Sequence, residues 1–435
     1  ADSFAAPNSA FGTLPVDLQT KLIPRLQRSS REIVSAPFAS LTSFEVHAAS
    51  EDPGVIASMA ALGVKYVVLH NIHDSLAQPG EPRLTAWLDA CDTAGIETRC
   101  ILNARDPEVW RTAVRNYGER IHHFSYLNEP NQPVKDDHTH PHVMPEQYVA
   151  ELREVRRAVR GIRRDVYLYG PELAMLMVME EKPFPWLRRA LEAGLLDYVD
   201  GVSFHPYRQG YSPKNMPEHP STFEGRPGEG YRTYLEQLAV LRERVRNYPL
   251  VINEVGWSTT PKGPISELTQ AKFALRQQIM DFAAGIRPAV YFMLRERHVD
   301  RPFPAGHLEN HFGIVRDDNT PKPAYRALQT LYALLDDGWV PVNAKEHFTQ
   351  KDVLSFAFEK VEGDVPVRQL LYWLPEPAAD DFPLRHTACT LNGVTVSELP
   401  LSEAPRALRL HQVQGRWGYP LLVDLLAQKQ EATLS

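Results

Sequence analysis

The chain has 435 residues, of which 43% are hydrophobic and 23% are charged, and its formal net charge is −7 at pH 7. This length exceeds what one hydrophobic core usually supports, so we expect a large domain and a smaller one. The negative charge argues against nucleic acid or an anionic membrane surface as the main partner. The sequence contains no apolar run long enough to predict a membrane span.

The cysteines and the first residue bear on metal binding and on compartment. Cys91, Cys100 and Cys389 cannot all pair and form no Cys-x-x-Cys pattern, so we expect neither a disulfide framework nor a structural zinc site. We also expect no cofactor. The chain begins at Ala1 and not at Met, which fits removal of a secretion signal or trimming and favours a secreted or periplasmic location over a cytoplasmic one.

From about residue 40 onward, runs rich in Val, Ile, Phe and Tyr alternate with segments of helical period, as in βα units around a parallel sheet. Helices are expected between the strands, the first over 53–62 and the last over 323–335. The eight expected strands are 41–48, 65–70, 97–103, 122–128, 166–170, 201–205, 250–254 and 289–295. The pattern predicts an α/β fold, a (β/α)8 or TIM barrel over residues 40–340.

After residue 345 the helical segments cease, and strands are expected at 353–360, 367–374 and 388–396. Their spacing predicts a small all-β sandwich domain over residues 341–435. Residues 1–39 have a mixed pattern, and we assign them to an N-terminal segment that packs on the barrel or the sandwich.

Two glutamates follow expected strands of the barrel, Glu129 after the fourth and Glu254 after the seventh. Reacting groups in such barrels lie at the carboxyl ends of the strands, so these two face each other across the mouth. One carboxyl can protonate the leaving oxygen of an acetal while the other attacks the anomeric carbon or activates water. A separation of about 5 Å means direct attack with retention, and roughly 6.5 to 9.5 Å means inversion.

The sequence Asn128-Glu129-Pro130 after strand four, together with Glu254 after strand seven, resembles glycoside hydrolase clan A. Strand six ends in His205-Pro206-Tyr207, similar to the histidine and aromatic pair of that clan, and residues 313–328 resemble its closing segment. The resemblance covers about residues 40–335. With the following sandwich, the layout is most similar to family 39, which holds β-xylosidases and bacterial exopolysaccharide hydrolases.

The resemblance implies a retaining glycoside hydrolase that cleaves β-linked glycosides or polysaccharide by double displacement. Glu254 would form the covalent glycosyl-enzyme, and Glu129 would act first as acid and then as base. Asn128 would hold the sugar 2-hydroxyl. His205 and Tyr207 would orient the nucleophile, with Tyr207 donating to Glu254 and keeping it ionised.

Two positions depart from the clan. Many members carry an arginine after strand two, where this chain has Leu69-His70-Asn71, and a tryptophan after strand eight, where it has Arg295. His70 is interpreted either as a contact to sugar hydroxyls or as a histidine satisfied inside the rim. Arg295 is a candidate contact to a charged or acylated sugar, and Arg99 on strand three a candidate substitute for the arginine.

Other residues have competing interpretations. Trp257 is either a stacking platform for a sugar ring or a core aromatic. Glu172 follows Pro171, which suggests a turn and a structural role, although it could touch a sugar hydroxyl.

Two further functions compete with hydrolysis of a glycoside. One is a catalytically silent carbohydrate-binding barrel, which the presence of both Glu129 and Glu254 disfavours. The other is a metal-dependent hydrolase with ligands from His138, His140 and His142, but three ligands from one loop rarely converge, so we expect no metal. Strand one also lacks the His-x-His pair that such barrels commonly carry.

Overall fold

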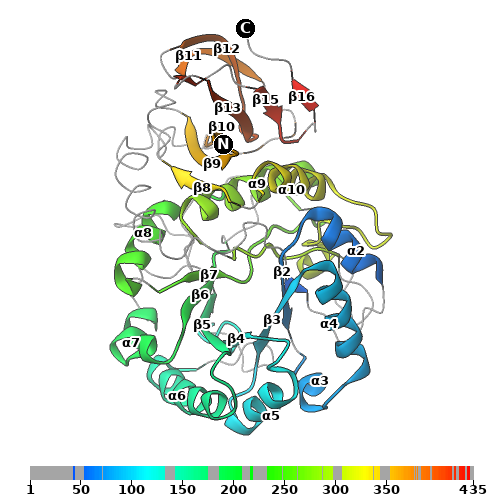
Figure 1. The fold of residues 1–435 in the computed structure, drawn as a ribbon, viewed down its shortest axis with the longest axis vertical. Helices are drawn as coiled ribbons and strands as arrows, with labels where there is room; N and C mark the ends of the chain where they lie inside the picture. Colours follow the sequence, from blue (N-terminus) through cyan, green and yellow to red (C-terminus); the bar gives the residue numbers. More distant parts are fainter. Residues whose placement is uncertain are drawn as a thin grey trace, which may run out of the picture.

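The computed structural model contains an α/β region and, after it, an all-β region (Figure 1). The predicted N-terminal segment, residues 1–39, lies outside the described residues. These are residues 43–44, 53–70, 72–132, 143–174, 186–207, 216–218, 233–246, 248–261, 263–286, 288–296, 306–336, 338–342, 353–376, 378, 380, 384–391, 394–413, 416–417, 421–426 and 429–431.

Seven parallel strands form one sheet in chain order from β1 to β7. The strands are β1 (Ser43–Phe44), β2 (Tyr66–His70), β3 (Glu97–Leu102), β4 (His123–Tyr126), β5 (Tyr167–Ala174), β6 (Gly201–His205) and β7 (Leu250–Ile252). The expected eighth strand contributes only isolated bridges, from Ala289 to Ile252 and from Arg295 to Val315. The described residues therefore show a parallel sheet of TIM-barrel type with seven strands.

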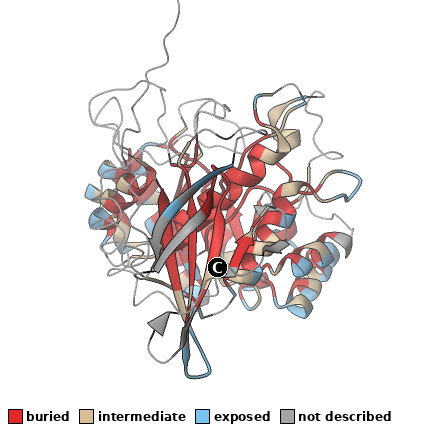
Figure 2. Ribbon diagram, turned by 90° about the horizontal axis from the view of Figure 1, so that it is seen from above, coloured by how far each residue is buried: buried red, intermediate tan, exposed pale blue. Residues whose placement is uncertain are grey.

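Helices surround this sheet on its outside, and Figure 2 shows the buried strands in the centre with exposed residues on the outer helical faces. The helices are α2 (Pro53–Leu62), α3 (His73–Ala77), α4 (Pro82–Ala94), α5 (Pro107–Tyr117), α6 (Pro145–Ile162), α7 (Trp186–Glu192), α8 (Tyr234–Val245), α9 (Glu267–Ala283) and α10 (Pro323–Leu334), with short 3-10 turns η2 (Leu195–Asp197) and η3 (Leu308–His311). Local sequence sets their ends. In α4, the Glu81 side chain accepts from the Leu84 N–H at 2.6 Å, and Gly95 ends the helix in a left-handed conformation.

The fifth strand extends beyond its predicted end at residue 170, because β5 continues to Ala174 through an irregularity between Gly170 and Leu173. Glu172 therefore lies inside the sheet, fully buried, and not in a turn after it. The prediction of a turn at Pro171 was wrong. The continued strand brings the carboxylate of Glu172 to the same end of the sheet as Glu129 and Glu254.

The all-β region contains a main sheet in the order β16-β15-β13-β10-β9-β8, with β14 beside β13, and a separate β11-β12 hairpin. The predicted single strand at 388–396 was wrong, because Leu391 pairs with Val394 across the hairpin turn. Leu399 and Leu401 of the hairpin share a core with the main sheet. The strands are β8 (Val340–Val342), β9 (Leu354–Glu362), β10 (Val365–Trp373), β11 (Arg385–Leu391), β12 (Val394–Leu401), β13 (Arg406–Val413), β14 (Arg416–Trp417), β15 (Leu421–Asp424) and β16 (Lys429–Glu431).

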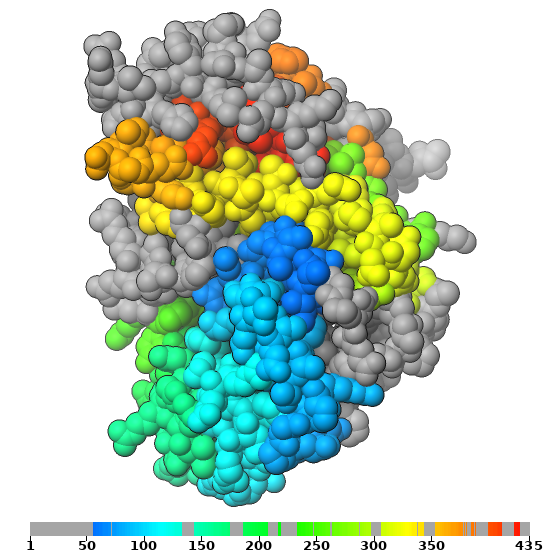
Figure 3. Space-filling model, turned by 45° about the vertical axis from the view of Figure 1, so that its right-hand side comes forward, coloured from blue at the N-terminus to red at the C-terminus, as the bar shows by residue number. Residues whose placement is uncertain are grey.

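The all-β region packs on α9 and α10, and Figure 3 shows α10 as part of a yellow band beneath the orange and red strands. The two regions share one hydrophobic core, in which Phe356 and Trp373 of the all-β region join residues of the barrel helices. Every residue of α9 from Thr269 to Ala283 is buried. This helix is thus enclosed on all sides, including the face that a barrel helix usually exposes.

Buried charges cross this junction. Lys272 forms an ion pair with Glu403, and Arg276 donates to the Glu403 carbonyl at 2.8 Å. Arg276 Nη1 lies 3.5 Å from Glu218 Oε2, and Trp373 Nε1 donates to Glu218 Oε1 at 2.6 Å. We call Glu218, Lys272, Arg276 and Glu403 the junction cluster.

The described helices include none that is both long and apolar enough to cross a membrane. Cys91 and Cys100 are buried free thiols.

Candidate active site

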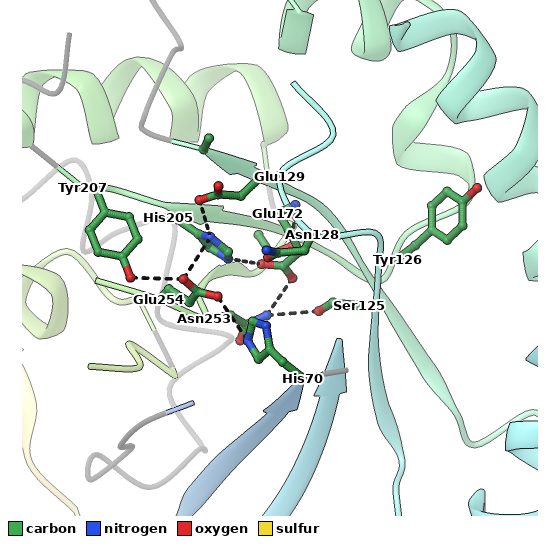
Figure 4. Close-up of polar contacts among 12 residues, drawn as sticks. His70, Ser125, Tyr126, Asn128, Glu129, Glu172, His205, Tyr207, Asn253 and Glu254 are labelled. Carbon is green, nitrogen blue, oxygen red and sulfur yellow. Dashed lines mark hydrogen bonds and ion pairs between the residues drawn. The ribbon is translucent and has the colours of Figure 1, made fainter. Parts of the chain in front are cut away.

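Glu129 and Glu254 come together where β4 and β7 end, and Figure 4 shows both side chains directed at His205. Backbone bonds fix the turn after β4: the Asn128 N–H donates to Asn103 Oδ1 at 2.6 Å, and the Glu129 N–H donates to the Glu172 carbonyl at 3.0 Å. A carboxylate oxygen of Glu129 and one of Glu254 lie within 4.8 Å of each other. The predicted pair of facing carboxyls is therefore present.

His205, at the end of β6, lies between three carboxylates and is fully buried. Its Nδ1 is 3.0 Å from Glu129 Oε1 and 3.7 Å from Glu254 Oε2, while its Nε2 is 2.9 Å from Glu172 Oε2. Burial disfavours the charged ring, but the carboxylates of Glu254, Glu129 and Glu172 raise the pKa of His205 well above its ordinary value. We call Glu129, Glu172, His205 and Glu254 the carboxylate cluster.

Two further side chains contact Glu254. Tyr207 Oη donates to Glu254 Oε2 at 3.0 Å, as predicted, and His70 Nε2 lies 3.2 Å from Oε1. Burial, together with the negative charge of Glu129, raises the pKa of Glu254 to about 8. The positive charge of His205 and the hydrogen bond from Tyr207 act in the opposite direction and lower it. The prediction that Tyr207 keeps Glu254 ionised is thus too simple. The charge of Glu129 disfavours ionisation of Glu254 beside it.

The sequence suggested a structural role or a sugar contact for Glu172, and its place beside His205 was not predicted. It is fully buried, so it cannot touch a sugar hydroxyl. Its Oε1 accepts from Asn253 Nδ2 at 2.6 Å, and its backbone N–H donates to Ser203 Oγ at 3.2 Å. Burial opposes ionisation, but bonds from His205, Ser125 and Ser203 nevertheless lower the pKa of Glu172.

Arg99 was a candidate substitute for the arginine that many clan members carry after strand two. Arg99 lies in the middle of β3, where its guanidinium is 4.7 Å from the centre of the Tyr66 ring and 5.5 Å from that of Tyr169. It is committed to these rings and to Glu97, at 3.5 Å, so the prediction that Arg99 substitutes for the arginine was wrong.

The remaining candidates are less closely tied to the carboxylates. Trp257 is 3% exposed and packs against Phe273 and Tyr291, with ring centres 5.5 and 6.4 Å away, so it is a core aromatic and the structure does not support a stacking platform. Arg295 donates to the Asp317 carbonyl at 2.9 Å. Its assignment to substrate stays a prediction.

The predicted alternative with His138, His140 and His142 lies outside the described residues. Within the described residues, Glu129, His205 and Glu254 bring ligand-type atoms within 4.8 Å of one another and could hold a metal ion. A histidine binds a metal only through an unprotonated ring nitrogen. In the structure both ring nitrogens of His205 lie within hydrogen-bond distance of carboxylates, Nδ1 of Glu129 and Nε2 of Glu172.

No protein-family model matches the sequence, and no curated protein matches it either. Solved structures do match. A family 39 glycoside hydrolase from the gut symbiont Bacteroides cellulosilyticus is 18% identical with a TM-score of 0.61, and the match covers 86% of this chain and 81% of that one. The chain has the fold of these glycoside hydrolases.

Two other solved structures agree with this fold. A family 39 enzyme from Xanthomonas axonopodis pv. citri is 16% identical, has a TM-score of 0.54, and is matched over 82% of this chain and 78% of its own. A glucosidase from Croceicoccus marinus is 14% identical, with a TM-score of 0.53 and coverage of 88% and 84%. The resemblance to clan A and family 39 read from the motifs is confirmed at the level of fold.

Proposed function

We propose that this protein is a retaining glycoside hydrolase that cleaves β-linked glycosides or polysaccharide. One observation carries the proposal: two carboxyls at the ends of β4 and β7 have oxygens within 4.8 Å of each other. Retaining enzymes place their carboxyls about 5 to 5.5 Å apart, whereas inverting enzymes leave space for a water molecule. The fold shared with glycoside hydrolases supports the same conclusion.

In the first step, an oxygen of Glu254 attacks the anomeric carbon while the bond from that carbon to the leaving oxygen breaks. Glu129 transfers its proton to the leaving oxygen. Tyr207 and His70 hold the two oxygens of Glu254, which fixes the direction of attack. The products are a glycosyl ester on Glu254, an ionised Glu129 and the free alcohol.

In the second step, Glu129 takes a proton from water, and the water oxygen attacks the anomeric carbon. The bond to Glu254 breaks, and its carboxylate is released. Two inversions at one carbon give net retention, and Glu129 is again protonated for the next substrate.

Asn128 is proposed to hold the sugar beside the nucleophile. Its side chain is 7% exposed, and its Oδ1 has no hydrogen-bond partner among the described residues. A buried amide oxygen without a partner is unfavourable by about 1 to 3 kcal/mol. A substrate hydroxyl that donates to this oxygen would remove that cost and so bind more tightly.

We also propose that residues 289–295 close the barrel as its eighth strand. The bridge from Ala289 to Ile252 is parallel and lies beside β7, where a closing strand belongs. The shared core of the β11-β12 hairpin and the main sheet supports a sandwich for the all-β region.

The test is turnover of a panel of aryl β-glycosides and polysaccharides, with the anomeric configuration of the first product followed by NMR. Glu254→Gln and Glu129→Gln should each reduce turnover by about 10²-fold to 10⁴-fold or more, and the parent should give a retained product. In Glu129→Ala, azide should attack the ester without a base and yield a β-glycosyl azide.

Glu97→Gln is the matched control, because Glu97 is also a carboxylate beside a histidine of the same sheet, 3.2 Å from His123 at the amino end of the strands. It should retain parental turnover. An inverted product would exclude double displacement. Binding of glycans without any turnover would favour the silent carbohydrate-binding barrel.

A further inference from the structure

The carboxylate cluster contains more acidic groups than the proposed reaction uses. Glu129 and Glu254 exchange roles during turnover, but Glu172 is buried beneath them and reaches only His205 and protein dipoles. Burying a carboxylate is costly unless its partners are fixed. Because Glu172 cannot contact a sugar, any role it has in the reaction must act through the residues that it touches.

We propose that Glu172 is a positioning residue that keeps His205 protonated on both ring nitrogens, so that its Nδ1–H donates to whichever of Glu129 and Glu254 is ionised. This inference rests on the proposed glycosidase function and adds a part to its mechanism. The decisive geometry is that Glu172 holds Nε2 at 2.9 Å while Nδ1 lies 3.0 Å from Glu129 and 3.7 Å from Glu254.

The two states of the reaction make this arrangement useful. In the form that reacts, the proton lies on Glu129 and Glu254 is ionised; in the glycosyl ester, Glu254 is neutral and Glu129 is ionised. In each state one carboxylate of the pair is charged. An imidazolium that turns its Nδ1–H hydrogen bond from Glu254 to Glu129 can therefore stabilise the negative charge in both states. Donors already in place need no reorganisation when the charge moves.

A neutral His205 could not do this. With a proton on Nε2 alone, its Nδ1 could only accept a hydrogen bond and would have no proton to donate to the ionised carboxylate of the pair. Only a permanent anion on the Nε2 side favours the doubly protonated ring throughout the cycle. Glu172 is suited to that role because the Asn253 amide donates to it at 2.6 Å, and bonds from His205, Ser125 and Ser203 lower its pKa despite burial.

The described groups that face His205 and can change charge come from several strands. They are Glu129 after β4, Glu172 in β5, Tyr207 after β6 and Glu254 after β7, with His70 of β2 beyond Glu254. Of these, Glu172 is the carboxylate that the proposed reaction leaves unchanged. Its effect can therefore be separated from catalysis.

The first experiment needs no substrate. Protein with isotopically labelled histidine is titrated by NMR, and the His205 signal is assigned by its loss in His205→Asn. In the parent, both ring nitrogens of His205 should carry protons at pH 7. In Glu172→Gln the titration should move to lower pH by about 1 to 3 units, and Glu172→Asp, which keeps the charge, should move it less.

A parent His205 that is neutral at pH 7 would overturn the inference even if no variant folds. An unchanged titration in folded Glu172→Gln would overturn it as well. Circular dichroism of each variant establishes folding.

The second experiment is kinetic. Glu172→Gln should lower kcat by about 10-fold to 100-fold with little change in KM, because the buried side chain acts on the reacting carboxyls and not on the sugar. The alkaline limb of its pH profile should also move upward, since a less positive His205 favours the protonated form of the pair. Glu97→Gln should change neither quantity.

The two proposals fail in different ways. A parent with doubly protonated His205 and no turnover on any glycoside would refute the hydrolase and leave the role of Glu172 toward His205 intact. A parent with turnover whose kcat and pH profile do not respond to Glu172→Gln would refute the positioning role alone.

Discussion

The carboxylate cluster and the junction cluster are both groups of buried charges, yet they are built differently. In the junction cluster, Lys272 and Arg276 balance Glu218 and Glu403, and backbone carbonyls accept the remaining N–H groups of Arg276. In the carboxylate cluster, three carboxylates surround the imidazole of His205, and among the described side chains His70 lies nearby as a further cation when protonated.

This difference in charge balance explains why the junction cluster is structural and the carboxylate cluster is suited to a reaction. In a balanced set each buried charge has an opposite partner, so the set can serve as a permanent link. A set with excess negative charge retains a proton, and that proton can be transferred. The same buried environment therefore stabilises a fold in one place and prepares chemistry in the other.

The largest effect should come from breaking the balanced cluster. Arg276→Met leaves Glu218 without its nearby cation and several carbonyls without donors, so the free energy of unfolding should fall by about 3 to 5 kcal/mol. Urea titration followed by circular dichroism measures this. Arg385→Met, which removes an exposed pair with Glu376, should change it by less than about 1 kcal/mol. Equal effects would show that the junction cluster is not a structural link.

The carboxylate cluster should respond in the opposite direction. Because the pKa of Glu254 is raised from 4.5 to about 8, ionising it costs stability progressively as the pH rises between these values, and none below the lower one. Glu254→Gln should match the parent near pH 4.5 and be more stable by about 2 to 4 kcal/mol above pH 8.

Glu218→Gln in the junction cluster provides the contrast, since it should be less stable than the parent at both pH values. Thermal unfolding of the three proteins at pH 4.5 and 8.5 makes the comparison. A Glu254→Gln variant that is less stable at the higher pH would contradict the excess of negative charge.

Removing one donor from Glu254 should affect activity and leave the fold unchanged. Tyr207→Phe deletes the bond at 3.0 Å, and hydrogen bonds to charged groups contribute about 1.5 to 3 kcal/mol. We expect kcat/KM to fall by about 10-fold to 100-fold. Tyr325→Phe, which loses a bond to the Ser58 carbonyl on the outer helices, is the control and should retain parental kinetics.

The smallest expected effect is the loss of kcat/KM in the parent protein as the pH rises above about 8. Because the pKa of Glu254 is raised to about 8, we expect the Glu129–Glu254 pair to hold one proton below this pH and so to contain one acid and one nucleophile. Above it both are ionised, and kcat/KM should fall about tenfold per pH unit because no proton remains for the leaving oxygen. A profile that stays flat to pH 10 would place the shared proton elsewhere.

The sequence predicted the two reacting carboxyls because each follows a hydrophobic strand, and strand ends converge in a parallel sheet. The resemblance to clan A implied the bond between Tyr207 and Glu254, which the structure contains. Side chains that lie beyond a strand end were harder to predict. Trp257 turns into the core between Phe273 and Tyr291, a direction that no local pattern determines.

The contacts of Glu172 with His205 and of His70 with Glu254 were not predicted, for a different reason. Pro171 suggested the end of a strand, but β5 shifts register and continues, which brings Glu172 under His205. His70 was compared with an absent arginine, and its own reach to Glu254 depends on how β2 and β7 are placed across the sheet. Both contacts are set by tertiary geometry, which sequence spacing does not encode.

The enclosure of α9 has a consequence for synthesis of the chain. Arg276 and the Glu403 carbonyl that it binds are 127 residues apart, and Glu218 and Trp373 are 155 apart. On the ribosome, α9 emerges long before the strands that cover it, so its buried cations meet water until the all-β region has been made. The barrel helices can form in order, but this one reaches its final environment only when nearly the whole chain has been translated.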